Sequence, residues 1–131
     1  MSIYSYNGNV TISDDADVTA NGGTATTDSY GIYAPGTMSI SGGTVYAEGG
    51  GASSGSSYGL RVGSVTISGD ADVTAKGGTA TNNSYGIYSL KDVSITDSTV
   101  YAEGGKSTVG SYGIYKADSS LGNLTISGTS V

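Results

Sequence analysis

The chain has 131 residues, enough for one domain, and all 11 of its aromatic residues are Tyr. Because it has no His and no Cys, it cannot form Ser-His or Cys-His catalytic pairs, disulfides or thiolate metal sites. Its net charge of −6 argues against nucleic acid as a partner, and no apolar run approaches the length that spans a membrane.

Short segments that alternate apolar and hydroxyl residues recur at regular intervals. In the first, Val10–Ser13, the alternation predicts a strand that buries Ile12 and exposes Thr11 and Ser13. This is the first strand of the repeat, and its equivalents are Met38–Ser41, Val65–Ser68, Val93–Thr96 and Leu124–Ser127. We expect one buried column of isoleucines: Ile12, Ile40, Ile67, Ile95 and Ile126.

A turn rich in Asp and Gly follows each of these strands. Such residues suit corners where the backbone takes a positive φ or accepts a side-chain hydrogen bond. Ca²⁺ takes about six to eight oxygen ligands, so carboxylates gathered at the turns are candidate calcium ligands, with plain turn formation as the alternative. These candidates are Asp15, Asp17, Asp70, Asp72 and Asp97. The Gly42-Gly43 corner offers no carboxylate, so the acidic column is not continuous.

The second strand of the repeat carries Val and Ala on its inward face. Its copies are Val18–Ala20, Val45–Glu48, Val73–Lys76 and Val100–Glu103, with Thr19, Tyr46, Thr74 and Tyr101 facing outward. One outward column should hold Asn21, Glu48, Lys76 and Glu103. Placing Lys76 between two acids is the stabilising choice, because like charges on adjacent strands repel one another.

A Gly-rich loop then leads to the third strand, for which Ser84–Tyr88 is typical. Its copies are Ser29–Tyr33, Ser57–Arg61 and Ser111–Tyr115, spaced by 27 or 28 residues. We expect Tyr33, Tyr88 and Tyr115 to face outward, with Arg61 interrupting the column. Alternation assigns an inward or corner position, and a structural role, to Tyr30, Tyr58, Tyr85 and Tyr112. A loop around Pro35-Gly36 is expected to return the chain to the first strand.

Three short strands in each repeat of this length predict an all-β fold, the single-stranded parallel β-helix, or β-solenoid. We expect about four and a half coils with a right-handed crossover, spaced by about 4.8 Å. Residues 1–131 then form a single domain, interpreted as a segment of a longer repeat array. Open ends of such a rod predict weak end-to-end self-association.

The segment Ser39–Val45, taken with Tyr30–Ala34, resembles the β-solenoid repeats of secreted bacterial surface proteins. These repeats are similar in fold to the pectate-lyase-like superfamily, and some are labelled carbohydrate-binding. The resemblance implies an extracellular or cell-surface location, as part of a larger protein. Related repeats with Asp before the Gly-Ile of the third strand are associated with calcium. Here Tyr30 and its equivalents occupy that position, so this implication does not carry over.

These observations favour a non-enzymatic structural or adhesive module. A polysaccharide lyase would need a basic residue beside a calcium cluster, but Arg61 lies on a different face from the acidic turns. The alternative is a carbohydrate-binding module, since exposed aromatic rings can stack on sugars; the candidates are Tyr33, Tyr46, Tyr88, Tyr101 and Tyr115. Two further alternatives are ice binding through the Thr/Ser face of the first strands and an engineered or consensus solenoid.

Overall fold

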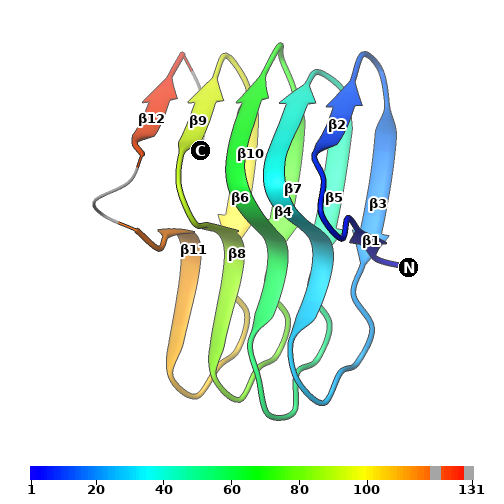
Figure 1. Ribbon diagram of the computed structural model, residues 1–131, viewed down its shortest axis with the longest axis vertical. Coiled ribbons are helices and arrows are strands. Elements are labelled where there is room, and N and C mark those ends of the chain that lie inside the picture. The colour runs from blue at the N-terminus through cyan, green and yellow to red at the C-terminus, as the bar shows by residue number, and fades with distance from the viewer. Residues whose placement is uncertain (119–121, 129–131) are drawn as a thin grey trace.

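The computed structural model describes residues 1–118 and 122–128. This part of the chain is all-β, with 12 strands and no helix, and its coils stack into a parallel β-solenoid of about five turns (Figure 1). The predicted fold class is therefore confirmed. Among the described residues no helix is long and apolar enough to cross a membrane.

The larger sheet contains the first and third strands of the repeat. Its central path is β1-β4-β6-β8-β11, while β2 pairs with β4, and β9 pairs with both β6 and β12. The strands are β1 (Ile3–Tyr4), β2 (Val10–Ser13), β4 (Ser29–Ser41), β6 (Ser57–Ser68), β8 (Asn83–Ser89), β9 (Val93–Thr96), β11 (Gly110–Lys116) and β12 (Leu124–Ser127).

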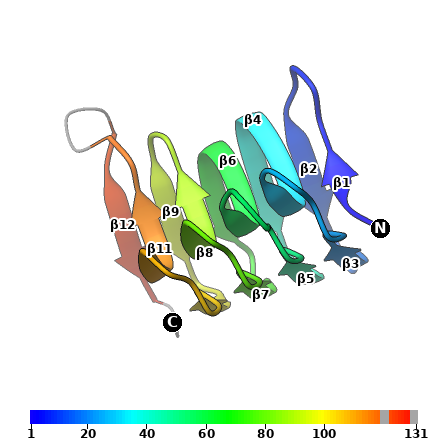
Figure 2. The same cartoon turned by 90° about the horizontal axis from the view of Figure 1, so that it is seen from below.

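The smaller sheet contains the second strand of each coil, in the order β10-β7-β5-β3. Its members are β3 (Asp17–Asn21), β5 (Thr44–Glu48), β7 (Asp72–Lys76) and β10 (Thr99–Glu103). Every pairing in both sheets is parallel and joins equivalent positions of neighbouring coils, so equivalent residues form columns along the rod (Figure 2).

The return to the first strand differs from the expected loop in the second and third coils. There the third and first strands are continuous, as β4 and β6. Pro35-Gly36 lies inside β4, where the register with β6 shifts between Ala34 and Thr37. The strand absorbs one extra residue relative to β6 as a bulge-like irregularity, so no separate loop forms.

The core is a narrow stack of aliphatic side chains between the two sheets. The isoleucines of the first strands pair in register from Ile12 to Ile126. Ile40, Ile67 and Ile95 are completely buried, as predicted. Ile126 is 44% exposed, because no described coil covers its outer side. Here the prediction of a buried isoleucine is wrong.

The two sheets approach each other closely at the glycine of the third strand. A Cβ on Gly59 would lie 2.6 Å from the backbone nitrogen of Lys76 and 2.7 Å from the carbonyl oxygen of Gly86. Such distances leave no space for any side chain. The Tyr-Gly-Ile motif therefore holds Gly at the point where the coil is thinnest.

A ladder of buried serines ties the Gly-Gly loops to the third strands. The Ser57 hydroxyl donates to the carbonyl of Gly50 in its own coil and accepts from the amide of Gly78 in the next, both at 2.8 Å. Ser29 and Ser84 make the equivalent pairs of bonds. Each serine therefore links two coils while satisfying backbone groups inside the rod.

Candidate functional site

Eight of the tyrosines form two adjoining columns on the outside of the larger sheet, here called the tyrosine ladder. In the first column, ring centroids lie 5.2 Å apart for Tyr30–Tyr58, 5.0 Å for Tyr58–Tyr85 and 5.2 Å for Tyr85–Tyr112. The interplanar angles are 16°, 11° and 14°, so the rings are stacked. The parallel register places identical side chains on successive coils at the spacing needed for this contact.

The second column contains four tyrosines and one arginine. Tyr4 stacks on Tyr33 at 4.6 Å, and Tyr88 stacks on Tyr115 at 5.5 Å. Arg61 pairs with Tyr33 on one side and Tyr88 on the other, so it separates the two stacks as the sequence predicted. The columns also touch each other, because Tyr30 and Tyr33 have ring centroids 5.0 Å apart.

Simple alternation assigned the first column an inward or corner position. In the structure its tyrosines lie outside the core. Tyr58 and Tyr85 are only 8% and 6% exposed, but neighbouring rings bury them and they lie outside the aliphatic core cluster. The strand breaks its alternation here, because the following Gly59 takes the inward position against the other sheet. The signal in the sequence was this glycine, since an inward Gly places the preceding residue on the outside.

Arg61 lies at the centre of the ladder. Its guanidinium carbon is 5.2 Å from the ring centroid of Tyr33 and 5.6 Å from that of Tyr58, and it also contacts the rings of Tyr30 and Tyr88. Cation–π attraction of this kind contributes about 0.5–2 kcal/mol. The Nε atom of Arg61 is buried and has no hydrogen-bond partner, so ring contacts replace solvent around this group.

Burial changes the ionisation of the ladder phenols. It raises the pKa of Tyr85 to about 12, and the neighbouring phenols add to this shift. Burial and then the Asp28 carboxylate raise the pKa of Tyr30, whose hydroxyl donates to Asp28 Oδ2 at 3.1 Å. These raised pKa values favour the neutral form of the Tyr30 and Tyr85 phenols.

The candidate sugar-binding residues of the third strands have limited free ring surface. Tyr33 and Tyr88 each stack on a tyrosine on one side and meet Arg61 on the other. Stacking on a sugar requires an exposed ring face. Tyr115 stacks on Tyr88 with one face, and within the described strands no further third strand pairs with β11 beyond it. Tyr33, Tyr88 and Tyr115 are all half-buried.

The remaining two candidates, Tyr46 and Tyr101, lie on the smaller sheet and are not brought together with the ladder. Tyr101 is 53% exposed. The Tyr46 hydroxyl donates to Glu48 Oε2 at 2.6 Å, and the Tyr101 hydroxyl makes the equivalent bond to Glu103 at 2.9 Å. These bonds raise the pKa of both phenols.

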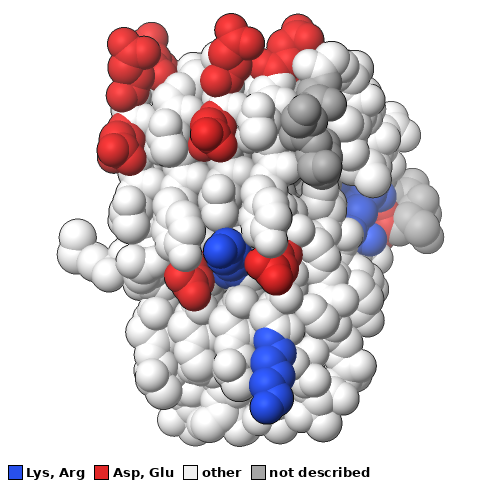
Figure 3. All heavy atoms as spheres, turned by 180° about the vertical axis from the view of Figure 1, so that it is seen from behind, with Lys and Arg blue, Asp and Glu red and all other residues white. Residues whose placement is uncertain are grey.

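Lys76 lies between these two pairs. In the register of the sheet it is flanked by Glu48 and Glu103, which confirms the predicted column of alternating charge (Figure 3). Its Nζ atom is 5.9 Å from the ring centroid of Tyr46 and 5.6 Å from that of Tyr101. The face of the smaller sheet thus carries a polar cluster, defined here as the Tyr/Glu/Lys cluster, of these five residues.

The predicted calcium ligands lie in the turns after the first strands or at the starts of β3 and β7. Acidic side chains gather at one edge of the rod (Figure 3). Asp17 and Asp72 alternate with Thr44 and Thr99 in the register, so a hydroxyl residue separates them. Asp70 and Asp97 instead form turn corners with positive φ, as does Asp14. No group of three or more His, Cys, Asp or Glu side chains that could hold a metal ion is formed within residues 1–118 and 122–128.

The hydroxyl residues of the first strands form two ranks in register. One rank passes through Thr11, Ser39, Thr66, Ser94 and Thr125, and the other through Ser13, Ser41, Ser68, Thr96 and Ser127. All of these residues are at least partly exposed. The predicted orientation of the first strand is therefore confirmed.

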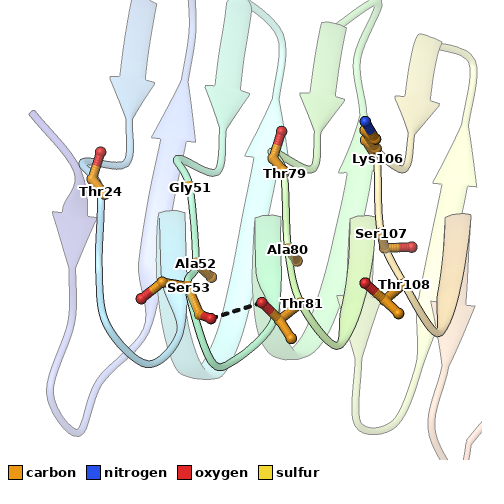
Figure 4. A pocket seen from close by; sticks show the side chains of 10 residues that line it. All are labelled: Thr24, Gly51, Ala52, Ser53, Thr79, Ala80, Thr81, Lys106, Ser107 and Thr108. Atoms are coloured by element: carbon orange, nitrogen blue, oxygen red, sulfur yellow. Dashed lines mark hydrogen bonds between the residues drawn. The ribbon is translucent and has the colours of Figure 1, made fainter.

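Sequence analysis did not predict the groove along the Gly-rich loops. It has a volume of about 480 Å³ and is lined by Thr24, Gly51, Ala52, Ser53, Thr79, Ala80, Thr81, Lys106, Ser107 and Thr108. Figure 4 shows these residues on the loops of neighbouring coils, where the hydroxyl of Thr81 donates to the carbonyl oxygen of Ser53 at 2.7 Å. Ala52, Ala80 and Ser107 of this lining belong to a column of parallel β-bridges that also includes Ala25. A second hollow of about 370 Å³ adjoins it and reaches Glu48.

Comparisons of the chain with protein families, curated proteins and solved structures found no match.

Proposed function

We propose that this chain is a non-enzymatic structural module, a stiff β-solenoid rod with an adhesive or spacer role in a larger protein. The resemblance of its repeats to those of secreted bacterial surface proteins supports an extracellular or cell-surface location. The same resemblance favours a fold similar to that of the pectate-lyase-like superfamily.

The observation that carries this proposal is that the surface tyrosines pack against one another between coils. Tyr58 and Tyr85 stack on each other and on further tyrosines above and below them. Aromatic pairs contribute about 0.5–1.5 kcal/mol beyond their burial, so the ladder stabilises contacts between coils that lie 27 or 28 residues apart in sequence. Side chains that stabilise the rod in this way have little face left for a ligand.

The ladder can be tested by removing aromatic contacts without disturbing the core. Tyr58→Ser with Tyr85→Ser should lower the free energy of unfolding by several kcal/mol, measured in urea. Tyr6→Ser is the control, because Tyr6 is 80% exposed and outside the ladder. Unchanged stability of the double variant, together with specific binding of a glycan by the wild type, would contradict the structural proposal.

Carbohydrate binding is the second candidate, and the smaller sheet favours it more than the ladder does. Tyr101 remains 53% exposed, and the hollow that reaches Glu48 continues into the hydroxyl-lined groove. An aromatic ring beside carboxylates and hydroxyls is an arrangement that can hold a sugar. Tyr46→Ala with Tyr101→Ala should abolish retention on a bound polysaccharide and leave the fold intact. A glycan array without binding by the wild type would exclude this function.

A further inference from the structure

We propose that the first column of the tyrosine ladder is an oxidative cross-linking site, where a one-electron oxidant joins tyrosines of neighbouring coils as dityrosine. The column contains Tyr30, Tyr58, Tyr85 and Tyr112. Such bonds would connect successive coils covalently. This modification goes beyond the proposed structural function and does not depend on it.

The tyrosines that would couple already lie next to each other in the folded protein. Tyr58 and Tyr85 have ring centroids 5.0 Å apart and an interplanar angle of 11°, and both belong to the same register position. Two phenols stacked in the same orientation bring the ring carbons ortho to their hydroxyls close together. The radical coupling that forms dityrosine joins those carbons, so little motion of the backbone is required.

The amino-acid composition favours tyrosine as the side chain that a one-electron oxidant attacks. The chain has no Cys and no Trp, and of its two Met residues Met38 is completely buried. All 11 aromatic side chains are phenols, so no other aromatic ring competes for a one-electron oxidant. Without Cys, the chain also has no disulfide with which to connect its coils covalently.

The buried members of the column remain connected to exposed ones. Tyr112 is 37% exposed at one end of the ladder, and Tyr4 is 58% exposed at the other. Each link between these ends is a ring contact of 4.6–5.2 Å, including the contact of Tyr85 with Tyr112. An electron can therefore leave Tyr58 or Tyr85 through neighbouring rings although neither faces the solvent.

The reaction balances as a two-electron oxidation of a tyrosine pair. Each of two phenols gives one electron to the oxidant and loses its hydroxyl proton, and the two phenoxyl radicals form a carbon–carbon bond between their ortho positions. The ortho hydrogens then move to the oxygens and restore both phenols, so the product lacks two hydrogen atoms. For Tyr30 the proton acceptor is Asp28, whose Oδ2 atom already accepts the hydroxyl at 3.1 Å.

Arg61 interrupts the second column and should therefore prevent cross-linking at that position. It separates Tyr33 from Tyr88 in the second column, so these two tyrosines should not be joined to each other. Arg61→Tyr would make the second column continuous. New cross-links that include position 61 should then appear.

The test uses photo-oxidised ruthenium(III) polypyridyl complex as the oxidant, with persulfate as the final electron acceptor, at low protein concentration. Dityrosine fluorescence is measured on the monomer band, and cross-linked peptides are located by mass spectrometry after proteolysis. We expect links Tyr30–Tyr58, Tyr58–Tyr85 and Tyr85–Tyr112 in the wild type.

Matched variants distinguish the ladder from ordinary surface oxidation. Tyr58→Phe with Tyr85→Phe keeps the stacked rings but removes the phenols, and should lower the yield of intramolecular dityrosine to that of the second-column pairs Tyr4–Tyr33 and Tyr88–Tyr115, which also stack. Tyr46→Phe with Tyr101→Phe removes the same number of phenols outside the ladder and should leave the yield unchanged. Equal losses in both double variants, or cross-links only between molecules, would overturn the proposal. Circular dichroism checks that each variant is folded.

Discussion

Glu48 pairs directly with Lys76 across β5 and β7, and Glu103 pairs with the other side of the same lysine across β10 and β7. Lys76→Glu would place three acids in one column about 4.8 Å apart. We expect the free energy of unfolding to fall by roughly 1–2 kcal/mol, because favourable cross-strand pairs become repulsive and cation–π contacts are lost.

Urea denaturation of Lys76→Glu should be compared with Lys91→Glu. Lys91 is exposed on the segment between β8 and β9, so this control changes the net charge equally without changing the column. Added salt should restore part of the stability of the first variant. Equal losses in the two variants would indicate that net charge, not the register, sets the effect.

The inward and outward faces of the first strands can be tested at adjacent positions. Ile67 is completely buried, whereas Thr66 is exposed. Ile67→Asp would bury an unpaired charge between coils and should unfold the protein. Thr66→Asp should retain the wild-type circular dichroism spectrum and melting curve. If Ile67→Asp melts like the wild type, the assignment of the buried face is wrong.

The close approach of the two sheets predicts strong sensitivity at the glycine of the third strand. Gly59→Ala should destabilise the protein by about 1–3 kcal/mol, because the new methyl group would overlap the backbone at Lys76 and Gly86. Gly23→Ala is the matched control, since a Cβ there has no atom within 4 Å. Thermal melts of the two variants should differ clearly; similar melts would contradict the narrow core.

The ladder predicts a loss of stability at alkaline pH. The pKa of Tyr85 is raised to about 12, whereas tyrosine in an unfolded chain ionises near pH 10. Stability from this group is therefore complete below about pH 10 and decreases as pH rises from there towards 12, because the unfolded state loses its proton first. Urea midpoints across this range should fall less steeply for Tyr85→Phe. A decrease of equal steepness in Tyr85→Phe would assign the effect to other groups.

End-to-end association remains a prediction. Within the described strands, β3 and β10 are the two edges of the smaller sheet, and at the C-terminal end of the rod Leu124 and Ile126 are exposed. Sedimentation over a wide concentration range should show weak association, because these exposed strand edges and apolar side chains can pair with a second copy. Ile126→Lys should abolish it. A strict monomer at high concentration would exclude this contact.

Repeat spacing and period-two alternation were sufficient to predict the coils, the isoleucine column and the position of Lys76. These features follow from local pattern, because equivalent residues of successive repeats must pair in a solenoid. The continuous strand through Pro35-Gly36 could not be predicted, since turn-forming residues normally end a strand and the bulge depends on pairing with β6.

The position of the first tyrosine column was missed because alternation was applied across a glycine. The inward direction at Gly31 or Gly59 is filled by the backbone of the other sheet, so the glycine in the sequence was the available signal for this break in alternation. By contrast, the hydroxyl bonds of Ser57 to two different loops require the three-dimensional path of the Gly-rich segments. The loop groove follows from the same path.

The alternation of side chains between successive coils also has a consequence for folding. In a chain of near-identical repeats, a coil can pair during folding with the next coil but one instead of with its native neighbour. Skipping the coil that contains Lys76 would put Glu48 beside Glu103, and skipping the one that contains Thr44 would put Asp17 beside Asp72. Both errors bring like charges together, whereas the native order separates them. The two-coil alternation thus penalises mis-threaded assemblies that the uniform aliphatic core would tolerate.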